Sequence, residues 1–282
     1  MTYDLHCHSH FSDGVFDPEK LVYEAAREGV NTLALTDHDT VEGIERAISA
    51  GYEYGVKVIP GIEISTTWEN KTVHIIGLGV SINDNALCNG IAGLRRQRKH
   101  RAEKMVTGLQ KTGIDITAAD VANGVATENL TRTHFARYLV KKGFAKDIRT
   151  AFDRYLKKGK SAYVRGSWCA LEEAIEWIRN AGGLAVVAHP ARYGLTRSKL
   201  SHFLAEFKDH GGIGIEVSTG RSTVQEVMYF ADICTSYGFM ASQGSDFHEP
   251  SQYGVRLGGF PALPDKVVPV WEHPDFLVHG RI

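Results

Sequence analysis

The sequence of 282 residues predicts an α/β protein of the barrel type that carries a large helical insertion. Short apolar stretches alternate with helical ones, which is the pattern of parallel β/α architecture. Histidines and carboxylates follow most of the apolar stretches, and α/β barrels carry their chemistry at that end of the strands. About ninety residues between positions 80 and 171 lack the strand rhythm. We interpret them as an insertion on one barrel loop.

The barrel elements follow from apolar periodicity and from turn residues. Asp17 before Pro18 is typical of a helix start, with the aspartate as the cap and proline at the first helical position. Seven apolar runs are predicted strands: Tyr3–His8, Thr32–Thr36, Val56–Ser65, Thr72–Val80, Leu184–Ala188, Ile213–Val217 and Phe239–Gln243. Five helices are predicted between them: Pro18–Glu28, Val41–Tyr54, Leu171–Asn180, Ser198–His210 and Thr223–Tyr237.

One connection is too short for a parallel crossover. The polar stretch Thr67–Lys71 cannot hold a crossover helix, so its two flanking strands are predicted to form an antiparallel hairpin. A turn at Trp68-Glu69 would place Glu63 directly opposite His74. Side chains opposite one another across such a pair lie close enough to bind one ion.

The insertion is predicted to be helical and basic. From Leu87 to Gly166 it holds 18 Lys and Arg against 6 Asp and Glu, whereas the rest of the chain holds 14 against 27. This asymmetry suggests a polyanionic ligand. We therefore expect residues 1–86 and 167–282 to form the barrel, and residues 87–166 to form a lid over the substrate. The helices expected in it are Leu87–Thr112, Ala118–Ala122, Arg132–Lys142 and Asp147–Lys157.

The composition narrows the class of protein. Hydrophobic residues make up 43% and charged residues 23%, which is ordinary for a soluble globular chain. No apolar run reaches membrane-spanning length, and the first residues carry no secretory pattern. The four cysteines lack Cys-x-x-Cys spacing and are interpreted as reduced thiols. We expect a cytoplasmic protein with no membrane contact and no obligate protein partner.

Histidines and carboxylates recur along the whole chain in positions suited to metal binding. Because side chains alternate along a strand, His6 and His8 point the same way, and so do Asp246 and His248. Imidazoles and carboxylates that converge from many segments are the ligands that a cluster of divalent metals requires. The candidate ligands are His6, His8, Asp13, His38, Glu63, His74, His189, Asp246 and His248.

These residues stand in motifs that resemble those of the PHP (polymerase and histidinol phosphatase) family, in order along the barrel portion. The motifs are His6-x-His8, Ser12-Asp13-Gly14, Thr36-Asp37-His38-Asp39, Gly61-Ile62-Glu63, His74, Ala188-His189-Pro190 and Gly244-Ser245-Asp246-Phe247-His248. The resemblance implies a distorted (β/α)7 TIM-like barrel with three divalent ions at its mouth. Mn²⁺ is expected, with Fe²⁺ or Zn²⁺ as alternatives.

Carried over by position, the resemblance implies which residues bind each ion. The first ion would take His6, His8, Glu63 and Asp246; the second would share Glu63 and add His74 and His189; the third would take Asp13, His38 and His248. Every ligand position of the family pattern is filled in this chain.

Further motifs are similar to one bacterial, YciV-like subgroup of that family. They are Thr66–Asn70, Thr131–Arg137, Lys158–Lys160 and His189–Tyr193. Members of this subgroup are described as nucleoside 3′,5′-bisphosphate phosphatases and as 5′→3′ oligoribonucleases. The resemblance implies a phosphoesterase that removes the 3′ phosphate of such nucleotides, trims short 5′-phosphorylated RNA, or does both. A metal-bound hydroxide would attack phosphorus in line, so no catalytic side chain is assigned.

Substrate contacts are expected mainly from arginine, whose planar fork pairs with phosphate oxygens. Arg192 follows the His189-Pro190 turn and so starts near the metal ligands. The other expected contacts are Arg132, His134 and Arg165. Most of the run Arg95–Arg101 is interpreted as a solvated helix face, Asp37 as a partner that orients an imidazole, and Asp39 as a helix N-cap.

Three other functions remain open at this point. A histidinol-phosphate phosphatase would share the metal site, but a small monophosphate does not need so wide a basic surface. An amide or lactone hydrolase would act on a substrate that does not need the expected arginine contacts. A non-catalytic binding or accessory module would not need a complete ligand set.

Overall fold

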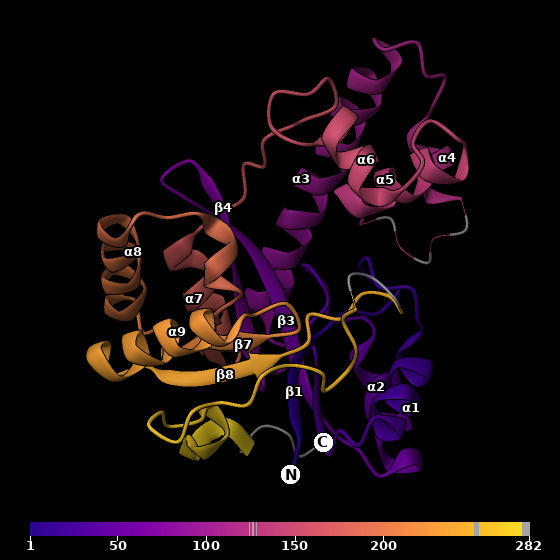
Figure 1. Ribbon diagram of the computed structural model, residues 1–282. Helices are drawn as coiled ribbons and strands as arrows, with labels where there is room; N and C mark the ends of the chain where they lie inside the picture. Colours follow the sequence, from indigo (N-terminus) through magenta and orange to yellow (C-terminus); the bar gives the residue numbers. More distant parts are fainter. Residues whose placement is uncertain (124, 126, 128, 251–253, 278–282) are drawn as a thin grey trace.

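The protein is described by a computed structural model that covers residues 1–282 except 124, 126, 128, 251–253 and 278–282. Its central sheet follows the order β1-β2-β3-β4-β6-β7-β8 (Figure 1). The strands are β1 (Tyr3–Cys7), β2 (Thr32–Leu35), β3 (Lys57–Trp68), β4 (Lys71–Leu78), β6 (Leu184–Val187), β7 (Gly214–Thr219) and β8 (Met240–Gly244). A short strand, β5 (Cys169–Ala170), pairs with β3 outside this path and was not predicted. All seven predicted strands are confirmed, with ends shifted by up to three residues.

The sheet nearly closes because β1 lies beside the end of β8. The backbone N–H of Asp246 donates to the carbonyl of His6 at 2.7 Å, and that of His8 donates to the carbonyl of Phe247 at 2.9 Å. A Cβ on Gly244 would stand only 2.4 Å from the Cβ of His6, so only glycine allows this approach. This closure agrees with the predicted distorted barrel.

The hairpin of β3 and β4 is antiparallel as predicted, but its register differs from the expectation. The turn lies at Glu69-Asn70, both with left-handed backbone (φ 39° and 66°), so the predicted turn at Trp68-Glu69 is wrong. Ser65 therefore faces His74, and Glu63 faces Ile76. A shift of the turn by one residue moves the pairing by two, which keeps every side chain on its face.

Helices cover the outside of the sheet, with α7, α8 and α9 on one side and α1 and α2 on the other (Figure 1). Asp17 caps α1 as predicted, because its side chain accepts from the N–H of Lys20 at 2.7 Å and Pro18 opens the helix. The bounds are α1 (Pro18–Arg27), α2 (Ile44–Tyr54), α7 (Leu171–Asn180), α8 (Arg197–Asp209) and α9 (Val224–Tyr237). The described residues also form short 3₁₀ turns at Pro190–Tyr193, Val270–Glu272 and Pro274–Leu277.

The insertion stands above the barrel as a helical body (Figure 1). Its long first helix belongs to both parts: Leu87 and Leu94 pack in the barrel core, whereas Met105 and Leu109 pack in a separate core around Phe135. The expected boundary at residue 87 therefore falls inside a helix. Its elements are α3 (Asn85–Gln110), α4 (Ala118–Ala122), α5 (Arg132–Lys141), α6 (Ile148–Ala151) and a π-helical turn (Phe152–Leu156), so the last predicted helix is split.

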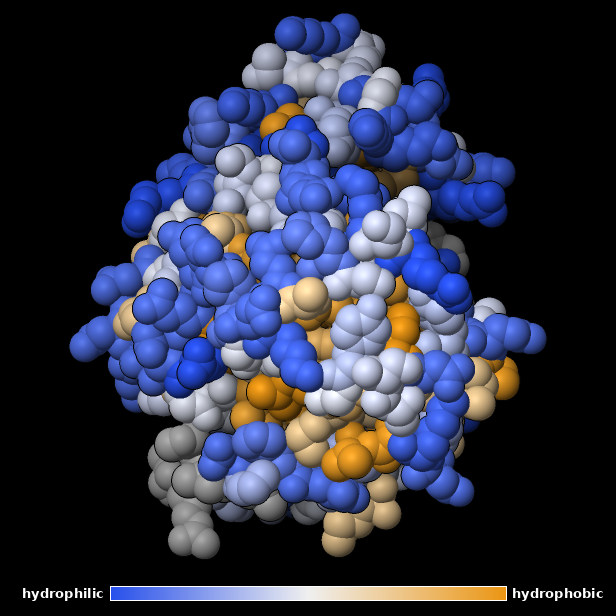
Figure 2. Space-filling view, turned by 90° about the vertical axis from the view of Figure 1, so that its left-hand side faces the viewer, coloured by the Kyte–Doolittle hydropathy of each residue, from blue (hydrophilic) through white to orange (hydrophobic). Residues whose placement is uncertain are grey.

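The surface reflects this division. Seen from the side of α8 and α9, the upper part, where the insertion lies, is mostly hydrophilic, and apolar side chains gather lower down over the barrel (Figure 2). Among the described residues, no helix is both long enough and apolar enough to cross a bilayer.

Candidate metal centre

All nine predicted ligands lie at one end of the barrel. Parallel strands bring their C-terminal ends to the same edge of a sheet, and β4 runs the other way, so His74 reaches that edge from near the start of its strand. His189 follows β6, and Asp246 follows β8. The remaining ligands come from β1 to β3 and the loops after β1, β2 and β8: His6, His8, Asp13, His38, Glu63 and His248.

Glu63 lies at the centre of the cluster and is fully buried. Its Oε1 lies 2.9 Å from both His74 Nδ1 and His189 Nε2, and its Oε2 lies 2.8 Å from His38 Nδ1. Burial by itself would raise the pKa of Glu63, but His38, His74 and His6 hold it well below its usual range. Glu63 is therefore an ionised carboxylate shared between several imidazoles.

His6, His8 and Asp246 form a second close group. The Nε2 atoms of the two histidines are 3.1 Å apart, and Asp246 Oδ1 lies 3.2 Å from His8 Nε2 and 3.4 Å from His6 Nε2. Burial, together with the neighbouring charge of His248, lowers the pKa of His8 to about 3. A neutral imidazole of this kind is the form that binds metals.

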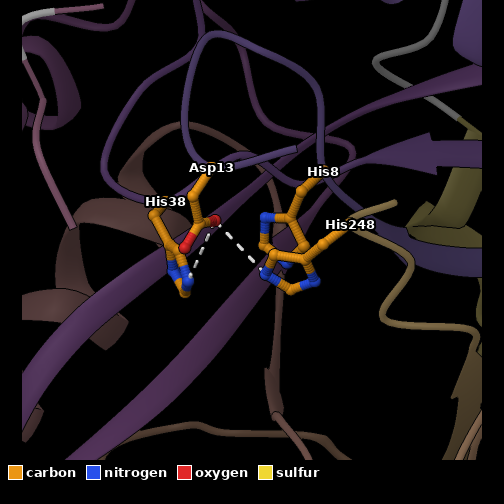
Figure 3. A group of neighbouring side chains, drawn as sticks. All are labelled: His8, Asp13, His38 and His248. Carbon is orange, nitrogen blue, oxygen red and sulfur yellow. Dashed lines mark ion pairs between the residues drawn. The ribbon is translucent and has the colours of Figure 1, made fainter. Parts of the chain in front are cut away.

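Asp13, His38 and His248 meet beside His8 (Figure 3). Asp13 Oδ1 lies 3.2 Å from His248 Nε2 and 3.8 Å from His38 Nε2. Burial would lower the pKa of His248, but Asp13 and Asp246 raise it to about 9. Burial would raise the pKa of Asp13, but His248 and His38 hold it well below its usual range.

The residues present fit divalent cations. Within the described part of the chain, Asp13 Oδ1 and Glu63 Oε2 are buried and accept no hydrogen bond, which leaves lone pairs directed at the cluster. Mixed nitrogen and oxygen donors suit Mn²⁺, Fe²⁺ or Zn²⁺. Among the described residues, four sets have donor atoms within 4.8 Å of one another: His8, Asp13, His38 and His248; His6, Glu63 and His189; His6, His8 and Asp246; and His38, Glu63 and His74.

These sets partly match the expected division among three ions. Asp13, His38 and His248 stay together, and Glu63 is shared, as expected. His6 and His38 also join sets with Glu63, so the sets share donors more widely than the expected division.

Two buried carboxylates support the ligands from behind. Glu216 on β7 was not predicted: its Oε1 lies 3.0 Å from His6 Nδ1, and its Oε2 accepts from the backbone N–H of His189 at 2.6 Å. An acidic residue within the apolar strand Ile213–Val217 was the available signal. Asp37 orients an imidazole less directly than expected, because Ser12 stands between them. Asp37 accepts from the hydroxyl of Ser12 at 2.6 Å, and Ser12 Oγ lies 3.4 Å from His8 Nδ1.

A cavity of about 320 Å³ opens above the ligands and beneath the insertion. Two of the predicted substrate contacts, Arg132 and Arg192, line it. Arg192 Nη1 also pairs with Asp246 Oδ2, so this arginine contacts a candidate ligand directly. Other lining residues include Ser65, Thr72, Arg98, Arg101, Tyr163, Trp168 and Tyr193.

The structure does not bring His134 or Arg165 to this cavity. His134 is buried, and its Nδ1 accepts from the backbone N–H of Thr131 at 3.0 Å as part of a capping box on α5. It lines a different cavity, of about 390 Å³, together with Arg137. Arg165 is exposed and donates to the carbonyl of Asn70 in the hairpin turn.

Arg98 and Asp39 differ from their sequence-based interpretation. Arg98 is only 3% exposed and pairs with Asp39 at 2.6 Å, while its Nη2 donates to Ser65 Oγ at 2.9 Å. Asp39 also accepts from the N–H of Ser65 at 2.7 Å and caps no helix, because α2 begins at Ile44 after Gly43. This buried pair fastens α3 to the barrel beside His38.

Known proteins resemble this chain over nearly its full length. A 3′,5′-nucleoside bisphosphate phosphatase from Chromobacterium violaceum is 40% identical over 95% of this chain and 94% of that protein. A 5′-3′ exoribonuclease from Haemophilus influenzae is 42% identical over 96% and 98%. A solved structure described as an amidohydrolase from Chromobacterium violaceum with bound sulfate and no metal has a TM-score of 0.94 at 38% identity, over 99% and 97% of the two chains.

The PHP domain profile matches residues 4–184, which include six of the nine candidate ligands. The order of the motifs, the nearly closed barrel and these similarities agree, and they confirm the resemblance noted in the sequence. The chain belongs to the PHP domain family.

Proposed function

We propose that this protein is a metal-dependent phosphoesterase that cleaves the ester at the 3′ oxygen of a nucleotide whose 5′ phosphate it also holds. Its substrates are nucleoside 3′,5′-bisphosphates, short 5′-phosphorylated RNA, or both. One observation carries the proposal: six of the candidate ligands and the arginines Arg101, Arg132 and Arg192 line one cavity of about 320 Å³. The six ligands are Asp13, His38, His74, His189, Asp246 and His248. The names of relatives that are 40% and 42% identical support both substrates.

The nine candidate ligands would hold the ions, three by the family pattern, with Mn²⁺ expected and Fe²⁺ or Zn²⁺ as alternatives. When bound, divalent ions neutralise phosphate charge and lower the pKa of water. The chain's own contribution is orientation: Glu216 directs His6, and Ser12 with Asp37 directs His8.

The arginines divide the cavity into two ends. Arg192 stands on the barrel next to Asp246, so it would hold the phosphate that reacts. Arg101 and Arg132 project from the insertion, on α3 and α5, and would hold the 5′ phosphate. Burial lowers the pKa of Arg132, with repulsion from Arg98 contributing. Burial also lowers the pKa of Arg101 to about 9, with repulsion from Arg132 and Arg98 contributing. A phosphate dianion between them would relieve that repulsion.

In this proposal the insertion, residues 87–166 apart from the start of α3 that packs in the barrel core, acts as a lid that supplies one phosphate site. The barrel supplies the other. A substrate with two phosphates spans both. The four free cysteines are typical of a reducing compartment, which supports action in the cytoplasm.

The alternative functions account for fewer of the charged residues that line the cavity. Histidinol phosphate carries one phosphate and would leave Arg101 and Arg132 without an anion. The solved structure described as an amidohydrolase raises amide hydrolysis again, but a neutral amide needs none of the three arginines. A non-catalytic module would not need donors with free lone pairs at the cavity floor.

A rate comparison tests the proposal. The purified protein, loaded with Mn²⁺, is assayed on adenosine 3′,5′-bisphosphate, on 5′-phosphorylated di- to hexanucleotides and on histidinol phosphate. We expect kcat/KM to be at least tenfold higher for the nucleotide substrates, and chelation by EDTA to remove activity. Faster turnover of histidinol phosphate, or full activity in EDTA, would overturn the proposal.

A further inference from the structure

The insertion touches the ligands of one candidate metal set directly. Thr131 Oγ1 donates to Asp13 Oδ2 at 2.9 Å, and Asn129 Nδ2 donates to the carbonyl of His38 at 2.7 Å. Arg137 Nη1 donates to the carbonyl of Asp13 at 2.8 Å. Three residues of the insertion thus hold two residues that belong to the same set of donors.

The bond from Thr131 orients the carboxylate of Asp13. Thr131 is the N-cap of α5 and accepts from the N–H of Thr133 at 3.1 Å, so its single hydroxyl proton is free to point at Asp13. This bond occupies Oδ2 and leaves Oδ1 facing His248 and His38, as the dashed lines in Figure 3 indicate. Both Thr131 and Asp13 are at least 95% buried, so bulk solvent screens the contact only weakly.

The same helix end also faces the substrate cavity. Arg132, the next residue, lines the cavity, while Phe135 and Leu139 anchor α5 in the insertion's own core. Any movement of the insertion relative to the barrel would therefore move Thr131 and Arg132 together. The contact of Thr131 with Asp13 and the contact of Arg132 with a substrate phosphate would therefore change together.

We propose that Thr131 is a positioning residue that couples closure of the insertion to binding of the divalent ion held by Asp13, His38 and His248. This inference rests on the proposed function, in which those residues bind an ion. Because coupling is reciprocal, the bound ion stabilises the closed insertion, and a closed insertion raises the affinity for the ion. A nucleotide phosphate bound at Arg132 would strengthen ion binding by the same route.

Direct titration with Mn²⁺ tests the coupling without an activity assay. Binding is measured by calorimetry, and free Mn²⁺ by electron paramagnetic resonance, for the wild type, Thr131→Val, Thr131→Ser and Thr117→Val. Valine keeps the shape of threonine but removes the hydroxyl. Thr117 is the matched control, because it caps α4 in the same insertion and its described hydroxyl contacts lie within α4.

We expect Thr131→Val to lower the affinity for one of the bound Mn²⁺ ions by roughly 10- to 100-fold. This is the usual range for loss of a residue that supports a metal ligand. Thr131→Ser should stay close to the wild type, and Thr117→Val should not change Mn²⁺ affinity. Equal affinity in the wild type and Thr131→Val would refute the coupling. A wild type that binds no Mn²⁺ at all would instead refute the proposed function.

Hydrogen exchange provides a second measurement that does not depend on how the variant folds. In the wild-type protein, Mn²⁺ should slow amide exchange in α5, at residues 132–141, because the ion holds Asp13 against Thr131. Exchange in α9 should change much less. If exchange in α5 is the same with and without Mn²⁺, the insertion is not coupled to the ion.

Discussion

Glu216 and His6 form a buried pair in which Glu216 Oε1 lies 3.0 Å from His6 Nδ1. An imidazole that binds an ion through Nε2 carries its proton on Nδ1, and Glu216 is placed to accept that proton, while Nε2 faces Asp246 and Glu63. Glu216 would thereby favour the tautomer that a metal ligand needs.

Replacing Glu216 should weaken the metal centre without removing a ligand. Glu216→Leu leaves His6 free to turn or to change tautomer, so Mn²⁺ affinity should fall by roughly 10- to 100-fold. Glu216→Gln keeps a hydrogen-bond acceptor, so its Mn²⁺ affinity should fall less than that of Glu216→Leu. Calorimetric titration with Mn²⁺ measures both variants. Unchanged affinity in Glu216→Leu would mean that His6 needs no support.

Asp246→Asn should abolish turnover while the fold is retained. The carboxylate lies within 3.4 Å of His6 and His8 and also pairs with Arg192, so its charge serves both ion and substrate. We expect kcat to fall by roughly a thousandfold, because metal ions supply several kcal/mol of transition-state stabilisation. Circular dichroism and a cooperative thermal transition check the fold. Substantial residual kcat in a folded variant would contradict the role of Asp246.

Arg192→Ala and Arg132→Ala should differ in their kinetics. Arg192 pairs with Asp246, so its loss should lower kcat as well as raise KM. Arg132 contacts the insertion side of the cavity, so its loss should mainly raise KM for a 3′,5′-bisphosphate, by roughly tenfold or more. Steady-state kinetics separates the two. If neither KM changes, the arginines do not bind the substrate's phosphates.

His134→Gln should reduce the loss of stability in acid. Burial and Arg137 lower the pKa of His134 to about 4, although Asp13 opposes the shift, whereas an unfolded histidine titrates near 6.5. Below pH 6.5 the unfolded chain binds the extra proton first, so stability is lost as the pH falls toward 4. Between pH 7 and pH 5 this should cost the wild type about 2 kcal/mol more than the variant.

Glutamine is the matched choice at this position because it also completes a capping box. Urea unfolding of both proteins at pH 7 and pH 5 measures the difference. Equal losses in the two proteins would show that His134 titrates normally in the folded state.

Arg98→Ala should destabilise the protein by about 3 kcal/mol, because it leaves the buried carboxylate of Asp39 without its partner. Arg96, on the exposed side of the same helix, is the matched control, and Arg96→Ala should change stability by less than about 0.5 kcal/mol. Thermal unfolding compares the two. Similar small effects would mean that the Asp39–Arg98 pair contributes little to stability.

The barrel strands could be predicted because their apolar periodicity is local. The hairpin turn is off by one residue because either Trp68-Glu69 or Glu69-Asn70 fits a two-residue loop, and only the backbone selects between them. His74 still lies 2.9 Å from Glu63, because the shift preserves the face of each side chain. Two of the four predicted substrate contacts reach the cavity, and His134 does not, because its ring serves the helix cap.

The sequence by itself determined the family, the barrel with its insertion, and a set of candidate ligands, since motifs and periodicity are written along the chain. Only the tertiary structure decided which buried groups support them. Glu216 lies 210 positions from His6, and Thr131 lies 118 positions from Asp13. Contacts over such separations depend on how the barrel closes and where α5 is held, and no local pattern specifies either.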